Sequence, residues 1–173
     1  MSETEELRKQ LVGVLKSRAM AFAAIYDEVA RELGPDRALA LMQRAIYARG
    51  AAMGKGFARF APADFAGLCD SFLGVLPDKA RPFQPEVLKN DAEGLDIKFH
   101  ACPQKEAWIE AGLPPERVAT MCAIAGAIDN GTFEGAGFAL QAETWAPGRD
   151  GCCLLKIRRA QATQEGAPLR NGD

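Results

Sequence analysis

Apolar side chains recur at helical spacing along the first half of the chain. Residues 2–33 form one amphipathic pattern that opens with a capping box, Ser2 with Glu5. After the break at GPD, Asp36 can cap a second helix over 37–49, and glycines at 50, 54 and 56 should then loosen the chain. A third apolar stripe predicts a helix within 63–76. The first half should therefore be helical.

In the second half of the chain, the spacing of apolar residues changes from a helical to a strand period. Residues 95–102 alternate apolar and polar side chains, as in a half-buried strand. Short helical patterns follow over 103–113 and from the two prolines at 114 and 115 to Asp129, where Asn130 and Gly131 end the helix. Two further strands, 133–145 and 152–160, flank the turn APGRDG and predict an antiparallel hairpin.

These elements predict the α+β class, with N-terminal helices packed on a small antiparallel sheet and mixed strands and helices in the second half. We expect one domain over residues 1–160 and a frayed polar tail over 161–173. The long first helix could pair with its copy in a homodimer, or it could wrap its own sheet.

Composition narrows the class of protein. The 173 residues are 48% hydrophobic and 25% charged, which is ordinary for a globular domain. A net charge of −2 and a pI near 5.6 argue against a nucleic-acid partner. The N-terminus is acidic and polar, unlike a signal peptide, and no apolar run approaches the roughly 20 residues that span a bilayer. We therefore expect a cytoplasmic protein with no membrane association, in which the five cysteines are reduced.

Thiols and one carboxylate gather in the second half of the chain. Cys102 closes a predicted strand and opens a helix, an environment that lowers a thiol pKa. Cys122 and Asp129 lie seven residues apart, close to two helical turns, and so share a helix face at roughly 10 Å separation. This spacing predicts either two ends of a pocket floor, or plain packing in which the thiol fills a gap and the carboxylate reaches solvent.

The other cysteines are judged by their strand or helix face. Cys153 shares a strand face with Leu155 and Ile157 and should point inward, whereas Cys152 should project to the opposite face. Cys69 lies within an apolar helix stripe, and we interpret it as a structural residue of the core. Because free cysteine often packs as a small hydrophobe, each thiol also has a purely structural interpretation.

Metal and cofactor sites have weak support. His100 and Cys102 could supply two zinc ligands from one strand face, but no C-x-x-C pair or H-E-x-x-H helix accompanies them. Phosphate loops and dinucleotide fingerprints are absent from the sequence. We expect no cofactor, and a zinc protein stays an alternative.

Several short motifs together resemble the L-2-amino-thiazoline-4-carboxylic acid hydrolases. They are ACP at Cys102 followed by EAW and Gly112, MC at Cys122, ID at Asp129, and CCLLKIRR at Cys153. The long first helix, the helix in ELGPDRALALMQRA and the glycines after it agree more loosely. The family also has some likeness to vinyl-reductase-type ligand-binding domains, so a non-catalytic small-molecule sensor is a second alternative.

The resemblance implies a hydrolase that opens a cyclic amidine, 2-amino-thiazoline-4-carboxylate or a related heterocycle, at a carbon–nitrogen bond. Such chemistry needs a nucleophile, an acid/base and a group that holds the substrate carboxylate. One of Cys102, Cys122 and Cys153 would be the nucleophile, although the doubled cysteine leaves the register between Cys152 and Cys153 open. Asp129 would act as acid/base or orient the amidinium. The candidate substrate-binding residues are His100, Arg49 and Arg158, the arginines as carboxylate clamps.

Overall fold

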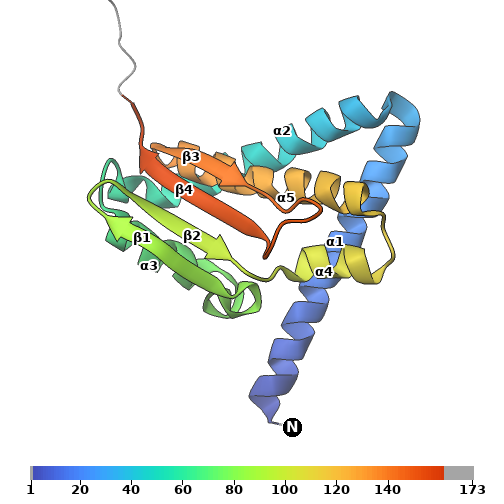
Figure 1. The fold of residues 1–173 in the computed structure, drawn as a ribbon, viewed down its shortest axis with the longest axis horizontal. Coiled ribbons are helices and arrows are strands. Elements are labelled where there is room, and N and C mark those ends of the chain that lie inside the picture. The colour runs from blue at the N-terminus through green and yellow to red at the C-terminus, as the bar shows by residue number, and fades with distance from the viewer. Residues whose placement is uncertain (1, 162–173) are drawn as a thin grey trace, which may run out of the picture.

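The computed structural model describes residues 2–161 and confirms the α+β class, with helices gathered on one side of a four-stranded sheet (Figure 1). The helices of this part of the chain are α1 (Glu3–Leu33), α2 (Pro35–Gly54), α3 (Phe65–Val75), α4 (Pro103–Glu110) and α5 (Pro115–Gly135). Two 3-10 segments, η1 (Lys55–Phe60) and η2 (Pro77–Phe83), flank α3. The strands are β1 (Pro85–Asp91), β2 (Gly94–Phe99), β3 (Phe138–Glu143) and β4 (Cys153–Arg159). The predicted tail lies outside the described residues from 162 onward.

The sheet has the order β1-β2-β4-β3, and all neighbouring strands are antiparallel. The predicted hairpin is β3 and β4, although β3 begins at Phe138 rather than 133 because α5 continues to Gly135. The predicted strand over 95–102 is β2 and ends at Phe99. The sequence pattern did not reveal β1, an edge strand whose side chains are mostly exposed.

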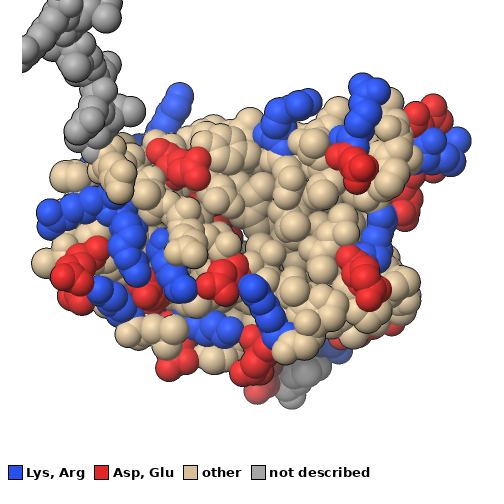
Figure 2. All heavy atoms as spheres, turned by 45° about the horizontal axis from the view of Figure 1, so that its top comes forward, with Lys and Arg blue, Asp and Glu red and all other residues tan. Residues whose placement is uncertain are grey.

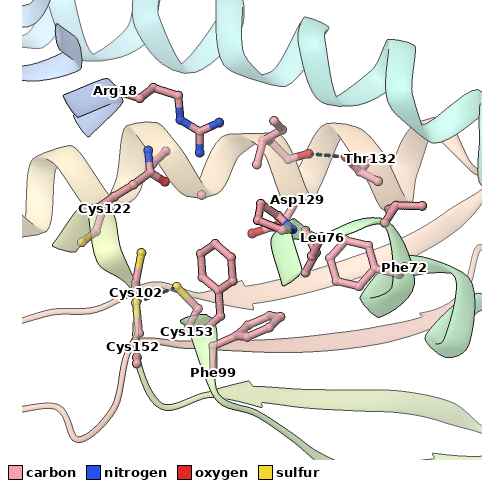
Figure 3. Close-up of a pocket in the computed structure, with 18 of the residues that line it drawn as sticks. Arg18, Phe72, Leu76, Phe99, Cys102, Cys122, Asp129, Thr132, Cys152 and Cys153 are labelled. Carbon is pink, nitrogen blue, oxygen red and sulfur yellow. Dashed lines mark hydrogen bonds between the residues drawn. The ribbon is translucent and has the colours of Figure 1, made fainter. Parts of the chain in front are cut away.

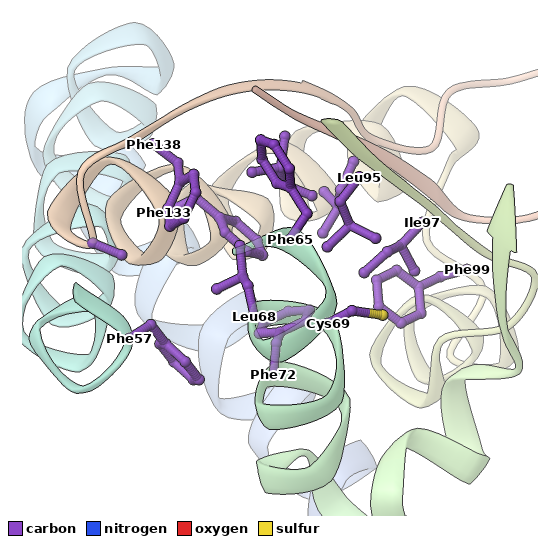
Figure 4. Packing of buried hydrophobic residues seen from close by; sticks show 13 residues of the cluster. Phe57, Phe65, Leu68, Cys69, Phe72, Leu95, Ile97, Phe99, Phe133 and Phe138 are labelled. Carbon is purple, nitrogen blue, oxygen red and sulfur yellow. The ribbon is translucent and has the colours of Figure 1, made fainter. Parts of the chain in front are cut away.

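One hydrophobic core fills the space between the sheet and the helices α3 and α5 (Figure 4). Leu95, Ile97 and Phe99 project into it from β2, as the alternation predicted. Buried phenylalanine rings from four other elements, η1, α3, α5 and β3, meet them there. Phe72 and Phe133 are in tilted contact with centroids 4.8 Å apart, so this core fixes α3 and the end of α5 against the sheet.

A second core lies on the far side of α5, among α1, α2 and α4. Its centre is Trp108, which is fully buried and donates from Nε1 to the Ala19 carbonyl oxygen at 2.8 Å. This bond ties α4 to the middle of α1. The first helix begins with the predicted capping box at Ser2 and packs mainly on α4 and α2 rather than on the sheet.

Glycines determine how α2 and α5 cross. The predicted break after residue 49 is wrong, since α2 continues through Gly50 to Gly54, and α5 likewise passes through Gly131. A Cβ atom on Gly50 would stand 2.2 Å from the Ile128 carbonyl oxygen, and one on Gly131 would stand 2.1 Å from the Tyr47 carbonyl oxygen. These glycines allow two backbones to touch, which outweighs their low helix propensity.

Charges of both signs are interspersed on the face shown in Figure 2. Several are paired across strands, such as Lys156 with Glu143 and Arg158 with Asp96. Among the described residues, no helix combines the length and apolarity that a bilayer crossing requires.

Candidate active site

A cavity of about 250 Å³ lies where the two cores meet. Its walls come from elements distant in sequence: α1, α2, η1, the segment from α3 to η2, the β2–α4 connection, α4, α5 and the start of β4. Most of the lining is apolar. The polar and ionisable lining residues are Arg18, Cys102, Gln104, Cys122, Asp129, Thr132, Cys152 and Cys153 (Figure 3). All four second-half cysteines therefore face one hollow.

Cys102 is the N-cap residue of α4, at the strand-to-helix junction that the sequence predicted. Several groups lower the pKa of its thiol to about 7, and the strongest effect comes from the neighbouring Cys152 thiol. The sulfur forms no regular N-cap hydrogen bond, but the amides of Gln104 and Lys105 at the start of the helix and the Lys105 ammonium also favour the thiolate. Cys102 is thus the thiol most readily ionised at neutral pH.

Cys152 supports Cys102, contrary to its predicted position. It is buried and lines the cavity because β4 begins only at Cys153, so the alternation of strand faces does not extend to it. Its amide donates to the Phe99 carbonyl oxygen, which fixes the approach of the loop. The neighbouring Cys102 and Cys153 sulfurs, together with burial, raise the pKa of the Cys152 thiol, so this thiol stays protonated.

Cys153 has the predicted inward orientation. It is partly buried against the sheet core, and its sulfur lies 3.4 Å from that of Cys152. Cys122 is buried on α5, and desolvation raises the pKa of its thiol well above the ordinary value. Of the three nucleophile candidates, Cys102 has the environment of a thiolate and Cys122 that of a neutral thiol.

Asp129 lines the same cavity from α5 (Figure 3). Burial raises the pKa of its carboxyl to about 7, and the nearby Cys102 charge adds to the effect. The carboxyl receives no hydrogen bond from any side chain in the described part of the molecule, whereas Thr132, one turn later, donates to the Ile128 carbonyl oxygen at 2.8 Å. Asp129 and Cys122 do share a cavity-facing side of α5, as their seven-residue spacing suggested.

Arg18 and Gln104 are cavity residues that the sequence analysis did not select. Arg18 on α1 points toward the cavity in Figure 3 and forms no ion pair within residues 2–161. Gln104 is buried, with 8% of its surface exposed, and lies in the first turn of α4, two residues after Cys102. A signal for Arg18 was present, because it occupies a position between Leu15 and Phe22 on the apolar stripe of its helix.

The three predicted substrate-binding residues lie elsewhere. His100 is exposed, and its Nε2 is 2.7 Å from the Glu86 carboxylate. Arg49 is exposed on α2, and Arg158 is paired with Asp96 at 2.5 Å. None of the three lines the cavity, so a ligand held there would not contact them.

The zinc interpretation gains no support from the geometry. Across residues 2–161, no group of three or more histidine, cysteine, aspartate or glutamate side chains is arranged to hold a metal ion. His100 turns to Glu86 and Cys102 turns into the cavity, so the two predicted ligands diverge.

Comparisons place this fold and sequence among known proteins. The fold is similar to the crystal structure of a trafficking protein particle complex subunit 3 from Naegleria fowleri covalently bound to palmitic acid. The TM-score is 0.47 at 16% identity, over 84% of this chain and 95% of that chain. Comparison with curated proteins gave no match. The model of the L-2-amino-thiazoline-4-carboxylic acid hydrolase family matches residues 15–156, a span that contains every lining residue of the cavity, and the chain belongs to this family.

Proposed function

We propose that the protein hydrolyses a small cyclic amidine carboxylate, 2-amino-thiazoline-4-carboxylate or a related heterocycle, at the ring carbon–nitrogen bond. One observation supports this most strongly. Cys102 and Asp129 face the same cavity, and the pKa of the thiol is lowered to about 7 while that of the carboxyl is raised to about 7. At neutral pH a thiolate nucleophile and a carboxylic acid therefore coexist.

In the first step, the Cys102 thiolate adds to the amidine carbon between the ring sulfur and the ring nitrogen. The Asp129 carboxylic acid gives its proton to the ring nitrogen as the carbon–nitrogen bond breaks. The product of this step is a thioimidate on Cys102, with the substrate's new primary amine released and its exocyclic nitrogen kept. Asp129 is then a carboxylate.

In the second step, water adds to the same carbon while the Asp129 carboxylate accepts the proton of the water. Collapse of the adduct expels the Cys102 thiolate and leaves an S-carbamoyl group. Asp129 is again protonated, so one water is consumed and the enzyme is restored. The protonated Cys152 thiol, which favours the thiolate form of Cys102, stabilises the departing thiolate.

Two further side chains can hold the substrate. Arg18 has no carboxylate partner within the described chain and faces the cavity, so it can form a bidentate pair with the substrate carboxylate. The Gln104 amide, which lines the cavity near Cys102, can hydrogen-bond the exocyclic amine. These roles replace those first expected of Arg49, Arg158 and His100.

Cysteine substitutions test the proposal. Cys102→Ser should lower kcat/KM for 2-amino-thiazoline-4-carboxylate by at least about a thousandfold, because the hydroxyl is not ionised at neutral pH. Cys69→Ala is the matched control, since that buried thiol belongs to the sheet core and does not line the cavity. Cys122→Ala and Cys153→Ala test the other candidates. Full activity of Cys102→Ser would exclude Cys102 as nucleophile.

The product and the thiol titration give independent measurements. Cleavage at the ring carbon–nitrogen bond adds one water to the mass and creates a primary amine but no free thiol. Alkylation of Cys102 by iodoacetamide should show a midpoint near pH 7, well below that of an ordinary cysteine. A product with a free thiol would mean that the ring carbon–sulfur bond breaks instead.

A further inference from the structure

The cavity has more room than a bare ring needs. Its volume is about 250 Å³. A 2-amino-thiazoline-4-carboxylate has only about nine non-hydrogen atoms, whereas ligand sites enclose most of the surface of the molecules they bind. A bare ring bound at Cys102 would therefore leave part of the cavity empty.

The spare room has a distinct chemistry. In Figure 3 the cysteines lie on one side of Asp129, and Phe72 and Leu76 lie on its other side. We call the side away from the cysteines the apolar arm; it is lined by Phe72 and Leu76, with Phe57 packed edge-on against Phe72. Thr132, the polar lining residue nearest to Asp129 in sequence, already directs its hydroxyl to the Ile128 carbonyl oxygen. Water in such a place would find few partners, so the arm favours an apolar occupant.

We propose that the natural substrate carries an apolar substituent, alkyl or aryl, which occupies the apolar arm. This inference rests on the proposed function and specifies its substrate class. On the thiazoline ring, carbon 2 bears the amine and carbon 4 the carboxylate, so the substituent belongs on carbon 5. With the reacting carbon at Cys102 and the carboxylate at Arg18, the substituent extends past Asp129 toward Phe72 and Leu76.

A substrate series tests the inference on the wild-type chain. The value of kcat/KM is measured for the unsubstituted ring and for its 5-methyl, 5-propyl, 5-butyl and 5-phenyl derivatives. Each buried methylene should raise kcat/KM about threefold to fourfold, so the butyl compound should exceed the bare ring by at least tenfold. Equal or falling values along the series, with the bare ring hydrolysed, would overturn the inference and leave the proposed function intact.

A pair of variants locates the effect. Leu76→Trp places a larger side chain in the apolar arm and should bring the butyl-to-bare ratio of kcat/KM to about one or below. Val87→Trp, on exposed β1 and outside the cavity, should keep the wild-type ratio. An unchanged butyl-to-bare ratio in folded Leu76→Trp protein would contradict the proposal that the substituent occupies the apolar arm. If Leu76→Trp does not fold, the wild-type series decides alone. No hydrolysis of any compound removes the proposed function and this inference with it.

Discussion

Asp129 shows how the cavity changes the chemistry of a single side chain. Asp129 lies well inside α5, which continues to Gly135, and its carboxyl lacks a side-chain hydrogen-bond donor within the described chain. Burial then raises the pKa of the carboxyl to about 7. The raised pKa that suits Asp129 to the proposed role of acid should also make its ionised form costly to the folded protein.

A pH-dependent stability difference between wild type and Asp129→Asn follows. The wild-type carboxyl stabilises the fold most below its unfolded pKa of about 4, and this contribution is lost as pH rises through about 7. Asparagine does not ionise. In urea unfolding, Asp129→Asn should therefore be more stable than wild type at pH 8, by about 2 kcal/mol or more, with little difference at pH 4. Activity should fall at least about a hundredfold. A stability difference that is the same at both pH values would contradict this account.

The pKa values of the cysteine thiols differ sharply within this chain, because their surroundings differ. The junction of a strand and a helix at Cys102 was visible in the sequence, and the structure places its sulfur at the helix N-terminus as expected. The partnership with Cys152 was not visible, because it depends on where β4 begins and on the loop that precedes it. Local patterns identify what surrounds a residue along the chain but not what the fold brings beside it.

The crossing of α2 and α5 depends on the absence of side chains. The glycines looked like breaks in sequence because their propensity disfavours a helix interior, yet tertiary packing reverses that preference. Strand β1 was missed for a related reason. Its two central apolar residues, Val87 and Leu88, are adjacent rather than alternating, and its pairing with β2 is irregular between Val87 and Lys89.

Two glycine substitutions on helices should have opposite effects. Gly131→Ala directs a methyl group at the α2 backbone, so the helices must separate, and the free energy of unfolding should fall by about 2 kcal/mol or more. Gly13→Ala, in open space on α1, should instead raise it by roughly 0.5 to 1 kcal/mol. Urea denaturation of both variants measures the contrast. An unchanged free energy of unfolding in Gly131→Ala would mean that α2 and α5 can separate at little cost.

At the scale of the whole molecule, the cavity exists because two separate cores meet. The class of fold and most of the elements could be predicted from periodicity, since each element is patterned by the face it buries. The cavity could be predicted only in outline. Arg18, the thiols and Asp129 come from segments more than a hundred residues apart at the extremes, and their convergence is set by packing rather than by any local motif.

Ligand binding should stabilise the whole fold. With the inactive Cys102→Ser chain, substrate at about a hundred times its Kd should add about 2.7 kcal/mol, or roughly 5 to 10 °C in Tm. Arg18→Gln should reduce this shift, while Arg49→Gln, an exposed change outside the cavity, should not. Stabilisation by substrate of a wild-type protein that forms no product would instead favour a binding module. An Arg18→Gln shift equal to that of the parent would rule out the carboxylate clamp.

The bond from Trp108 to Ala19 has a consequence for motion as well as for packing. It anchors α1 at the residue next to Arg18, so the arginine reaches the cavity only while the helix is docked. By thermodynamic reciprocity, an anion that gains affinity from Arg18 must return the same free energy to the docking of α1. Amide hydrogens in the middle of α1 should then exchange with solvent more slowly when the cavity is filled, which makes this outer helix a reporter of occupancy.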